Sequence, residues 1–244
     1  MSLIVSSNIL VFDLDDTLFP ECSYVQSGFA AIDQWLLANH NISGFLARAL
    51  HHYNAGVRGQ TIDLALQDLK IFSQMLATKL VTLYREHRPS IALYPDARWA
   101  LEHCGQSHSL GVLTDGWLMS QQNKVRALDL EKYVNHLVYS DALGRESWKP
   151  NVAPYAAIVE RFACSHSDCV YIADNPQKDF VTARKLGWKT VRVVRPDGEY
   201  RKSVVPPDHD AHVTITSLYE LKALLPSACA AVSARSKDNP DHLL

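Results

Sequence analysis

Short hydrophobic blocks alternate with amphipathic stretches along much of the chain. The blocks are a few residues long, which is typical of strands that are buried on both faces of a parallel sheet. They cover residues 9–12, 110–113, 137–139, 170–173, 190–194 and 213–216. Because helical patterns separate most of these blocks, the sequence predicts an α/β fold, a doubly wound parallel sheet with a Rossmann-like core.

Capping residues suggest where some of the intervening helices begin and end. A helix over residues 96–104 is expected to have Asp96 as its N-cap and Gly105 just past its end. Another is expected to open at Pro176, since proline is favoured at the first helical position, and to end by Gly187.

Residues 20–89 follow a different pattern and predict an all-helical domain inserted after the first strand. Their hydrophobic residues recur at helical spacing without any strand-like block. Two stripes stand out: Val25, Phe29, Ile32, Trp35 and Leu36, then Leu69, Phe72, Leu76, Leu80 and Leu83. Residues 1–19 and 90–225 would form the α/β core. Residues 226–244, rich in Ala, Ser and charge, are expected to be a flexible tail.

Composition narrows the functional classes. The chain has 244 residues, of which 47% are hydrophobic, and its formal net charge is -2, so no electrostatic signal for nucleic acid or a membrane surface is present. No hydrophobic run is long enough to span a membrane, and residues 1–10 lack the basic start of a signal peptide. The five cysteines form no C-x-x-C pair, which favours a reducing, cytoplasmic location over a zinc or disulfide framework.

Polar residues follow several of the predicted strands. They are Asp13, Asp15, Asp16, Thr17, Thr114, Asp115, Lys149, Asp174 and Asp179. Taken singly, each is more often a cap, a turn former or a solvated loop residue. Parallel strands carry their sites at their carboxyl ends, however, so these side chains are expected to gather at one edge of the sheet.

The order of these residues resembles the haloacid dehalogenase-like superfamily of hydrolases. The matching motifs are D-x-D-x-T at Asp13, Asp15 and Thr17, a strand-end Thr114, Lys149, and D-x-x-x-x-D at Asp174 and Asp179. The resemblance covers residues 9–194, and the helical segment falls where this superfamily places its type-one cap. One position departs from the pattern, because the fourth motif often begins Gly-Asp and Ala173 stands here instead.

The resemblance implies a phosphatase that acts on a small phosphorylated metabolite of the sugar phosphate or nucleotide type. Clustered carboxylates would repel a phosphate dianion, so a divalent cation is needed to reverse the local field. Oxygen ligands without Cys or His suit Mg²⁺. By resemblance, the side chains of Asp13 and Asp174 and the backbone carbonyl of Asp15 would hold this ion.

The resemblance also assigns roles in catalysis. Asp13 would be the nucleophile that forms an aspartyl-phosphate, and Asp15 would protonate the leaving alkoxide and then activate water. Thr114, Lys149 and the backbone N–H near Asp115 would hold the phosphoryl oxygens.

Two further residues would support this site, and a third would not. Thr17 is expected to orient Asp15, and Asp179 to support the metal ligands from behind. Asp16 is expected to point away from the site and to be structural. The dehalogenase members lack an Asp at the position of Asp15, so its presence favours phosphoryl chemistry over carbon–halogen cleavage.

Two alternatives stay open. A phosphomutase of the same superfamily shares every motif, and a non-enzymatic phosphoryl receiver also uses Asp, Thr and Lys around Mg²⁺, although receivers are roughly half this length. The expected partner is a small phosphorylated molecule, without nucleic acid or membrane, and the oligomeric state stays open. Substrate choice would come from residues near the mouth, with Glu21, Tyr24, Arg58 and Trp148 as candidates. A solvated turn residue is the alternative for Arg58, and burial against the sheet is favoured over substrate stacking for Trp148.

Overall fold

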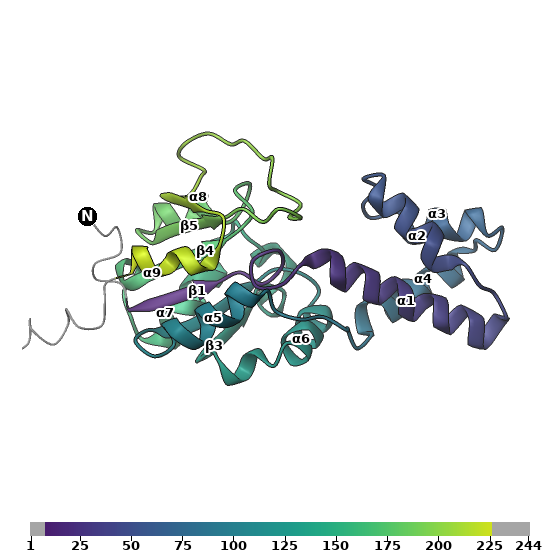
Figure 1. Cartoon of the computed structure of the whole chain (residues 1–244), viewed down its shortest axis with the longest axis horizontal. Helices are drawn as coiled ribbons and strands as arrows, with labels where there is room; N and C mark the ends of the chain where they lie inside the picture. The colour runs from purple at the N-terminus through teal and green to yellow at the C-terminus, as the bar shows by residue number, and fades with distance from the viewer. Residues whose placement is uncertain (1–7, 226–244) are drawn as a thin grey trace, which may run out of the picture.

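The computed structural model describes residues 8–225 (Figure 1). A six-stranded sheet has the order β3-β2-β1-β4-β5-β6, and all neighbouring strands are parallel. The strands are β1 (Ile9–Phe12), β2 (Ser109–Thr114), β3 (His136–Tyr139), β4 (Cys169–Ala173), β5 (Lys189–Val193) and β6 (Val213–Ile215). The predicted fold class, a doubly wound parallel sheet, is confirmed.

Helices cover both faces of the sheet (Figure 1). They are α5 (Pro95–Cys104), α6 (Leu118–Ala127), α7 (Ala153–Phe162), α8 (Phe180–Lys185) and α9 (Leu221–Leu224). In β1, Leu10 and Phe12 pack with residues of α5, α6 and α9, whereas Ile9 and Val11 pack with residues of α7 and α8. Because successive side chains of a strand point to opposite faces, a strand covered on both sides must be hydrophobic throughout. This explains the unbroken apolar blocks in the sequence.

Four of the helices between β1 and β2 form a lobe beside the sheet domain (Figure 1). They are α1 (Glu21–His40), α2 (Phe45–Asn54), α3 (Thr61–Asp68) and α4 (Gln74–Glu86), together called the helical insertion below. The insertion has a hydrophobic cluster of its own, in which Ile32, Leu36, Phe45, Leu66 and Leu80 are fully buried. The α1 helix runs from the strand ends into this lobe, so its first turn borders both parts of the molecule.

The second hydrophobic stripe differs from the prediction near its start. Leu69 and Phe72 share the helical spacing of this stripe, but α3 ends at Asp68 and α4 begins at Gln74, so both residues lie between the two helices. Lys70 adopts the left-handed conformation (φ 59°), which ends the helical path. Phe72, in the connection, is 41% exposed.

Asp96 is not the N-cap of its helix, contrary to the prediction. The helix α5 begins one residue earlier, at Pro95. The Asp96 carboxylate instead accepts hydrogen bonds from Arg195 Nη1 (2.6 Å), Ser217 Oγ (2.8 Å) and the backbone N–H of Leu218 (2.7 Å). Tertiary partners therefore replace the local capping bond that the sequence suggested.

The helix expected to open at Pro176 begins later, at Phe180. Residues 175–179 form a turn instead, in which the backbone N–H of Asn175 donates to Asp179 Oδ2 at 3.0 Å. This turn holds Asp179 close to the end of β4. The tail expected over residues 226–244 lies outside the described residues.

Candidate active site

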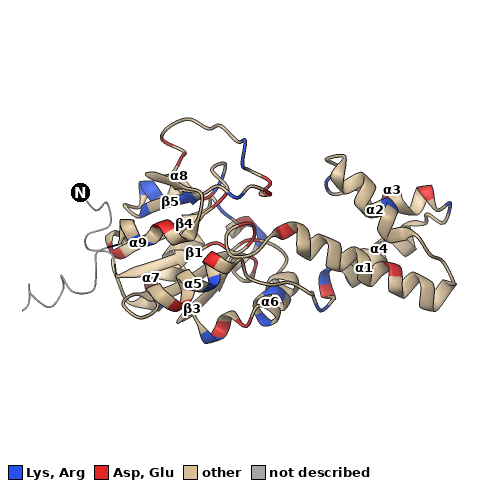
Figure 2. Cartoon of the chain, in the orientation of Figure 1, with Lys and Arg blue, Asp and Glu red and all other residues tan. Residues whose placement is uncertain are grey.

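Three neighbouring strands end at the same place in the sheet. Asp13 follows β1, Thr114 is the last residue of β2, and Asp174 follows β4. Since β1 lies between β2 and β4, these residues converge at the point where the strand order changes direction, the usual ligand site of such sheets. All three are buried. Acidic and basic residues lie together where this edge meets the start of α1 (Figure 2).

Lys149 joins two of the predicted carboxylates. Its Nζ atom lies 2.8 Å from Asp13 Oδ1 and 2.8 Å from Asp179 Oδ1, and it donates a hydrogen bond to the Tyr171 hydroxyl at 2.7 Å. Burial of this side chain opposes its charge, but Asp13 and Asp179 outweigh that effect and raise the pKa of Lys149 well above its usual value. The lysine is therefore a fixed positive charge beside Asp13.

The acidic groups outnumber this one lysine. Oxygens of Asp13, Asp174 and Asp179 lie within 4.8 Å of one another. Burial raises the pKa of Asp13 to about 6, although Lys149 lowers it. Burial, followed by the charges of Asp179 and Asp13, raises the pKa of Asp174 well above its usual value. Buried, crowded carboxylate oxygens without nitrogen or sulfur donors fit a hard divalent cation such as Mg²⁺.

Asp115, directly after β2, binds the loop that carries Lys149. Its Oδ1 atom accepts hydrogen bonds from Ser140 Oγ (2.6 Å) and from the backbone N–H of Lys149 (3.2 Å), and its Oδ2 atom lies 2.9 Å from Lys178 Nζ. Burial would raise the pKa of Asp115, but the two lysines and these hydrogen bonds hold it below its usual value. Only the backbone of Asp115 was assigned a role from the sequence, and Lys178 was missed.

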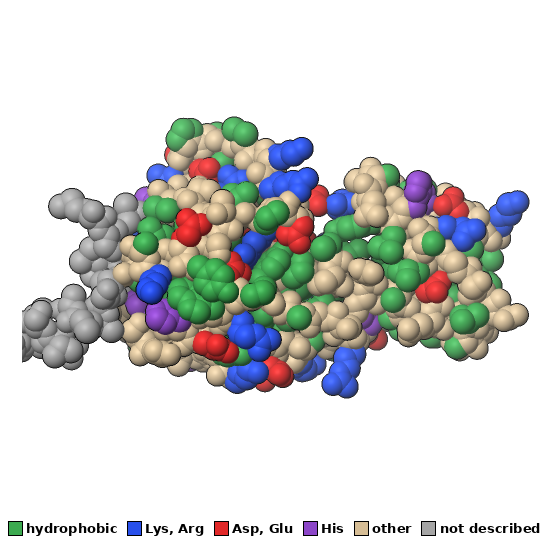
Figure 3. Space-filling view, in the orientation of Figure 1, with side chains coloured by type: hydrophobic (Ala, Val, Ile, Leu, Met, Phe, Trp, Pro, Cys, Tyr) green, Lys and Arg blue, Asp and Glu red, His purple; other side chains and the backbone are tan. Residues whose placement is uncertain are grey.

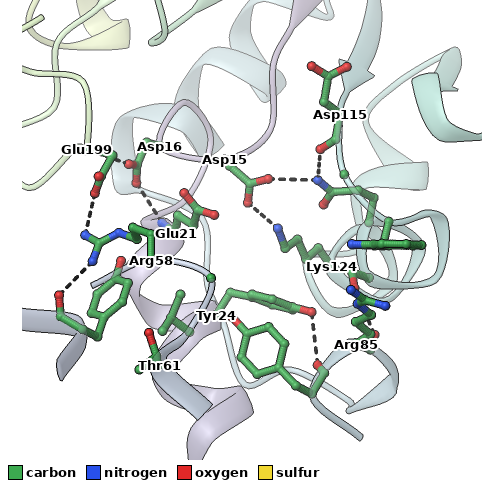
Figure 4. A pocket seen from close by; sticks show the side chains of 18 of the residues that line it. Asp15, Asp16, Glu21, Tyr24, Arg58, Thr61, Arg85, Asp115, Lys124 and Glu199 are labelled. Atoms are coloured by element: carbon green, nitrogen blue, oxygen red, sulfur yellow. Dashed lines mark hydrogen bonds and ion pairs between the residues drawn. The ribbon is translucent and has the colours of Figure 1, made fainter. Parts of the chain in front are cut away.

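Asp15 is held by residues that the sequence analysis missed. Lys124 Nζ lies 2.6 Å from Asp15 Oδ1, and Gln121 Nε2 donates to Asp15 Oδ2 at 3.0 Å (Figure 4). Gln121 also donates to the carbonyl of Asp115. Both residues are on α6, three positions apart, so they share one face of the helix. A Gln and a Lys at this spacing, a few residues after Thr114, were the signal available in the sequence.

Thr17 does not orient Asp15, contrary to the prediction. The Thr17 hydroxyl is buried without a hydrogen-bond partner among the described residues. The physical reason is that Asp15 turns toward α6, where an ammonium group offers a stronger bond than a neutral hydroxyl. Asp179 pairs with Lys149 at 2.8 Å and has a carboxylate oxygen within 4.8 Å of oxygens of Asp13 and Asp174, and its predicted supporting role stays a prediction.

A cavity of about 590 Å³ opens between the strand ends and the helical insertion. Hydrophobic side chains gather on the surface where the two lobes meet (Figure 3). Asp13, Asp15 and Asp174 line the cavity on the sheet side. The four residues expected near the mouth also line it: Glu21, Tyr24, Arg58 and Trp148.

Two of these residues, Glu21 and Tyr24, lie close to Asp15 or to its partner Lys124. Burial, with the charge of Asp15, raises the pKa of Glu21 to about 7. The Tyr24 ring lies 4.3 Å from Lys124 Nζ, and the Tyr24 hydroxyl donates to the carbonyl of Tyr84 at 3.3 Å. The first turn of α1 therefore places an acid near Asp15 and an aromatic ring beside Lys124.

Arg58 bridges the two lobes. Its Nη2 atom lies 2.8 Å from Glu199 Oε2, and its Nη1 atom donates to the carbonyl of Tyr53 at 2.8 Å (Figure 4). The Glu199 backbone N–H donates to Asp16 Oδ2 at 2.9 Å, and the Glu21 backbone N–H donates to Asp16 Oδ1 at 2.8 Å. Asp16 therefore ties the loop after β5 to the start of α1, and Arg58 is not a free turn residue.

Fold and site together define a hydrolase with a strand-end aspartate centre. The family model of haloacid dehalogenase-like hydrolases matches residues 10–193, and the chain belongs to this family. It is 26% identical to glyceraldehyde 3-phosphate phosphatase of Methanocaldococcus jannaschii over 87% of this chain and 94% of that protein. It is 23% identical to human N-acylneuraminate-9-phosphatase over 91% of this chain and 95% of that protein.

Solved structures share the fold. The 2-haloacid dehalogenase from Pseudomonas syringae aligns with a TM-score of 0.62 and 22% identity, over 89% of this chain and 97% of that one. The HAD-hydrolase YfnB from Bacillus subtilis aligns with a TM-score of 0.64 and 18% identity, over 90% and 99%. Within residues 8–225, no helix combines the length and the apolar character needed to cross a membrane.

Proposed function

We propose that this protein is a Mg²⁺-dependent phosphatase that hydrolyses phosphate monoesters of small metabolites. The observation that carries the proposal is a pair of carboxylates at one cavity edge with different partners: Asp13 beside Lys149, and Asp15 beside Lys124. One carboxylate can attack phosphorus while the other transfers protons. The two curated relatives above, both named as phosphatases, support this assignment.

In the first step, Asp13 attacks the phosphorus atom and the bond to the ester oxygen breaks. The leaving alkoxide takes a proton from Asp15, and an aspartyl-phosphate remains on Asp13. Thr114 and Lys149 hold the phosphoryl oxygens. In the second step, Asp15 removes a proton from water, which attacks the aspartyl-phosphate, releases inorganic phosphate and regenerates Asp13.

Mg²⁺ would be held by the carboxylates of Asp13 and Asp174 and the backbone carbonyl of Asp15. When bound, the ion offsets the repulsion between these carboxylates and the phosphate dianion. Asp179 would keep Lys149 in place rather than serve as a ligand, because both of its carboxylate oxygens have partners: Oδ1 pairs with Lys149 and Oδ2 accepts from the backbone N–H of Asn175.

The helical insertion would act as a cap that selects the leaving group. The sheet domain handles the phosphoryl group, whereas residues of α1 to α4 line the opposite side of the cavity. A cavity of about 590 Å³ is large enough for a sugar- or nucleotide-sized ester.

The test is release of inorganic phosphate from a panel of phosphorylated sugars, sugar acids and nucleotides, with and without Mg²⁺. Turnover of p-nitrophenyl phosphate separates an enzyme from a phosphoryl receiver. Consumption of a sugar phosphate without phosphate release would instead identify a phosphomutase.

Asp15→Asn should slow the hydrolysis of alkyl esters more than that of p-nitrophenyl phosphate, because a poor leaving group needs the proton. Absence of turnover on the whole panel would overturn the proposal.

A further inference from the structure

Four cationic side chains line the cavity, and three of them have carboxylate partners. Arg58 pairs with Glu199, Lys124 with Asp15, and Lys178 with Asp115, as described above. The fourth, Arg85, forms no ion pair with any Asp or Glu of residues 8–225. A cation facing a binding cavity without a protein anion leaves its charge available to a ligand.

Arg85 is held in place by contacts that leave its donors free. Its guanidinium carbon lies 3.7 Å from the centre of the Trp117 ring, and Ser120 Oγ donates to the Arg85 backbone carbonyl at 3.1 Å. Stacking on an indole uses the flat face of a guanidinium, whereas its N–H groups point outward in the plane. These in-plane N–H groups are the ones that bind a carboxylate or phosphate through two parallel hydrogen bonds.

The surroundings of Arg85 are positive rather than negative. The guanidinium carbon of Arg145 lies 4.6 Å from the same Trp117 ring. Burial and the charge of Arg145 lower the pKa of Arg85, the opposite of what a neighbouring carboxylate would do. Two arginines share one indole, and neither has an anionic partner in the described part of the chain.

Arg85 lies across the cavity from the Arg58–Glu199 bridge, on the same side as Lys124 (Figure 4). It comes from α4 of the helical insertion, the lobe proposed above to select the leaving group. We propose that Arg85 binds a second oxyanion, a carboxylate or a further phosphate, on the leaving group of the substrate. This proposal rests on the phosphatase function above and narrows it to phosphorylated sugar acids, bisphosphates and similar esters.

The test compares esters that differ only in the second anion. The pairs are 3-phosphoglycerate with glycerol 3-phosphate, 6-phosphogluconate with sorbitol 6-phosphate, and glucose 1,6-bisphosphate with glucose 6-phosphate. The parent enzyme should prefer the member with the second anion, either in the two carboxylate pairs or in the bisphosphate pair. The kind of pair that shows the preference identifies the oxyanion as a carboxylate or a phosphate.

Arg85→Gln removes the charge while keeping a polar side chain. It should lower kcat/KM for the preferred ester with a second anion about tenfold to hundredfold more than for the counterpart that lacks it, mainly through KM. Arg85→Lys, which keeps the charge without the planar fork, should lose less. The matched control is Arg88→Gln, because Arg88 is exposed, lies three residues further on and does not line the cavity.

An equal loss on both members of every pair would overturn the proposal, because Arg85 would then serve the phosphoryl group or the fold. No preference for an anionic ester in the parent enzyme would overturn it as well. If the parent fails to hydrolyse even p-nitrophenyl phosphate, the phosphatase assignment itself fails. Calorimetric binding of 6-phosphogluconate and sorbitol 6-phosphate, to the parent and to Arg85→Gln, then still decides whether the anion site exists.

Discussion

The ammonium nitrogen of Lys124 lies 2.6 Å from a carboxylate oxygen of Asp15, with only 5% of the lysine side chain exposed. Burial would lower the pKa of Lys124, but Asp15 and Glu21 outweigh it and raise that pKa. The lysine stays charged and fixes the direction of the Asp15 carboxylate. Lys124 is thus a positioning residue for the proposed proton transfer.

Lys124→Met should therefore impair catalysis through Asp15. Loss of a charge-assisted hydrogen bond is worth about 1.5–3 kcal/mol, so kcat for alkyl phosphates should fall about tenfold to hundredfold. The loss should be smaller for p-nitrophenyl phosphate, which hardly needs a proton. Lys132→Met is the control, since Lys132 is exposed and, within residues 8–225, forms its one ion pair with Asp129 at the surface. Equal losses on both esters would mean that Lys124 supports only the fold.

Asp13→Asn should abolish turnover while the protein stays folded. An amide is a very poor nucleophile, so a loss on the order of 10³-fold or more is expected. The fold should survive because Lys149 keeps Asp179 as its ion-pair partner. Phosphate release and circular dichroism are measured on the same sample. Activity within about tenfold of the parent would rule out attack by Asp13.

Mg²⁺ should raise the unfolding temperature. A ligand that binds only the folded state stabilises it by about 2.7 kcal/mol at a hundred times its Kd, which is worth about 5–10 °C for a chain of this size. Chelator should reverse both the shift and the activity. Ca²⁺ should stabilise the protein yet inhibit turnover, since its looser shell misplaces the nucleophile. Asp174→Asn should weaken the shift, and sodium chloride at equal ionic strength is the control.

The Arg58–Glu199 bridge should act on substrate binding more than on stability. Its side chains are 43% and 39% exposed, and such ion pairs contribute about 0–1 kcal/mol to folding. If Arg58 works by holding the two lobes together, Arg58→Ala and Glu199→Gln should raise KM by similar amounts, and the double variant should add little. If Arg58 contacts the substrate itself, Arg58→Ala alone should show the larger effect. Kinetics of the three variants separate these outcomes.

Asp96→Asn should destabilise the protein at neutral pH. Burial would raise the pKa of Asp96, but Arg195, Ser217 and the Leu218 N–H together lower it. A carboxylate whose pKa is lower in the folded state stabilises the fold above its unfolded pKa, and this contribution is lost as the pH falls through the folded pKa. We expect a loss of about 1.5–3 kcal/mol at pH 7 that shrinks below about pH 4. Denaturant titrations at both pH values test this, with exposed Asp129→Asn as the control.

The sequence by itself determined the architecture of the sheet and the chemical residues at its edge. Hydrophobic blocks are contiguous, and a strand buried on both faces must be apolar throughout, so β1, β2 and β4 are readable without any tertiary information. Asp13, Thr114 and Asp174 are adjacent to those blocks, and parallel strands necessarily bring their ends together. The helical insertion is equally visible, because its apolar residues recur with a helical period.

Only the tertiary structure decided which partners these residues have. Lys124 and Asp15 are 109 positions apart, and Arg58 and Glu199 are 141 positions apart. Asp96 is a further example of a partner that the sequence does not reveal. Local capping rules predict a helix cap there, whereas its carboxylate accepts a hydrogen bond from Arg195, 99 positions away. Such pairs depend on strand order and on where the insertion lies over the sheet. No local pattern encodes that placement, because ion-pair energies act through space and not along the chain.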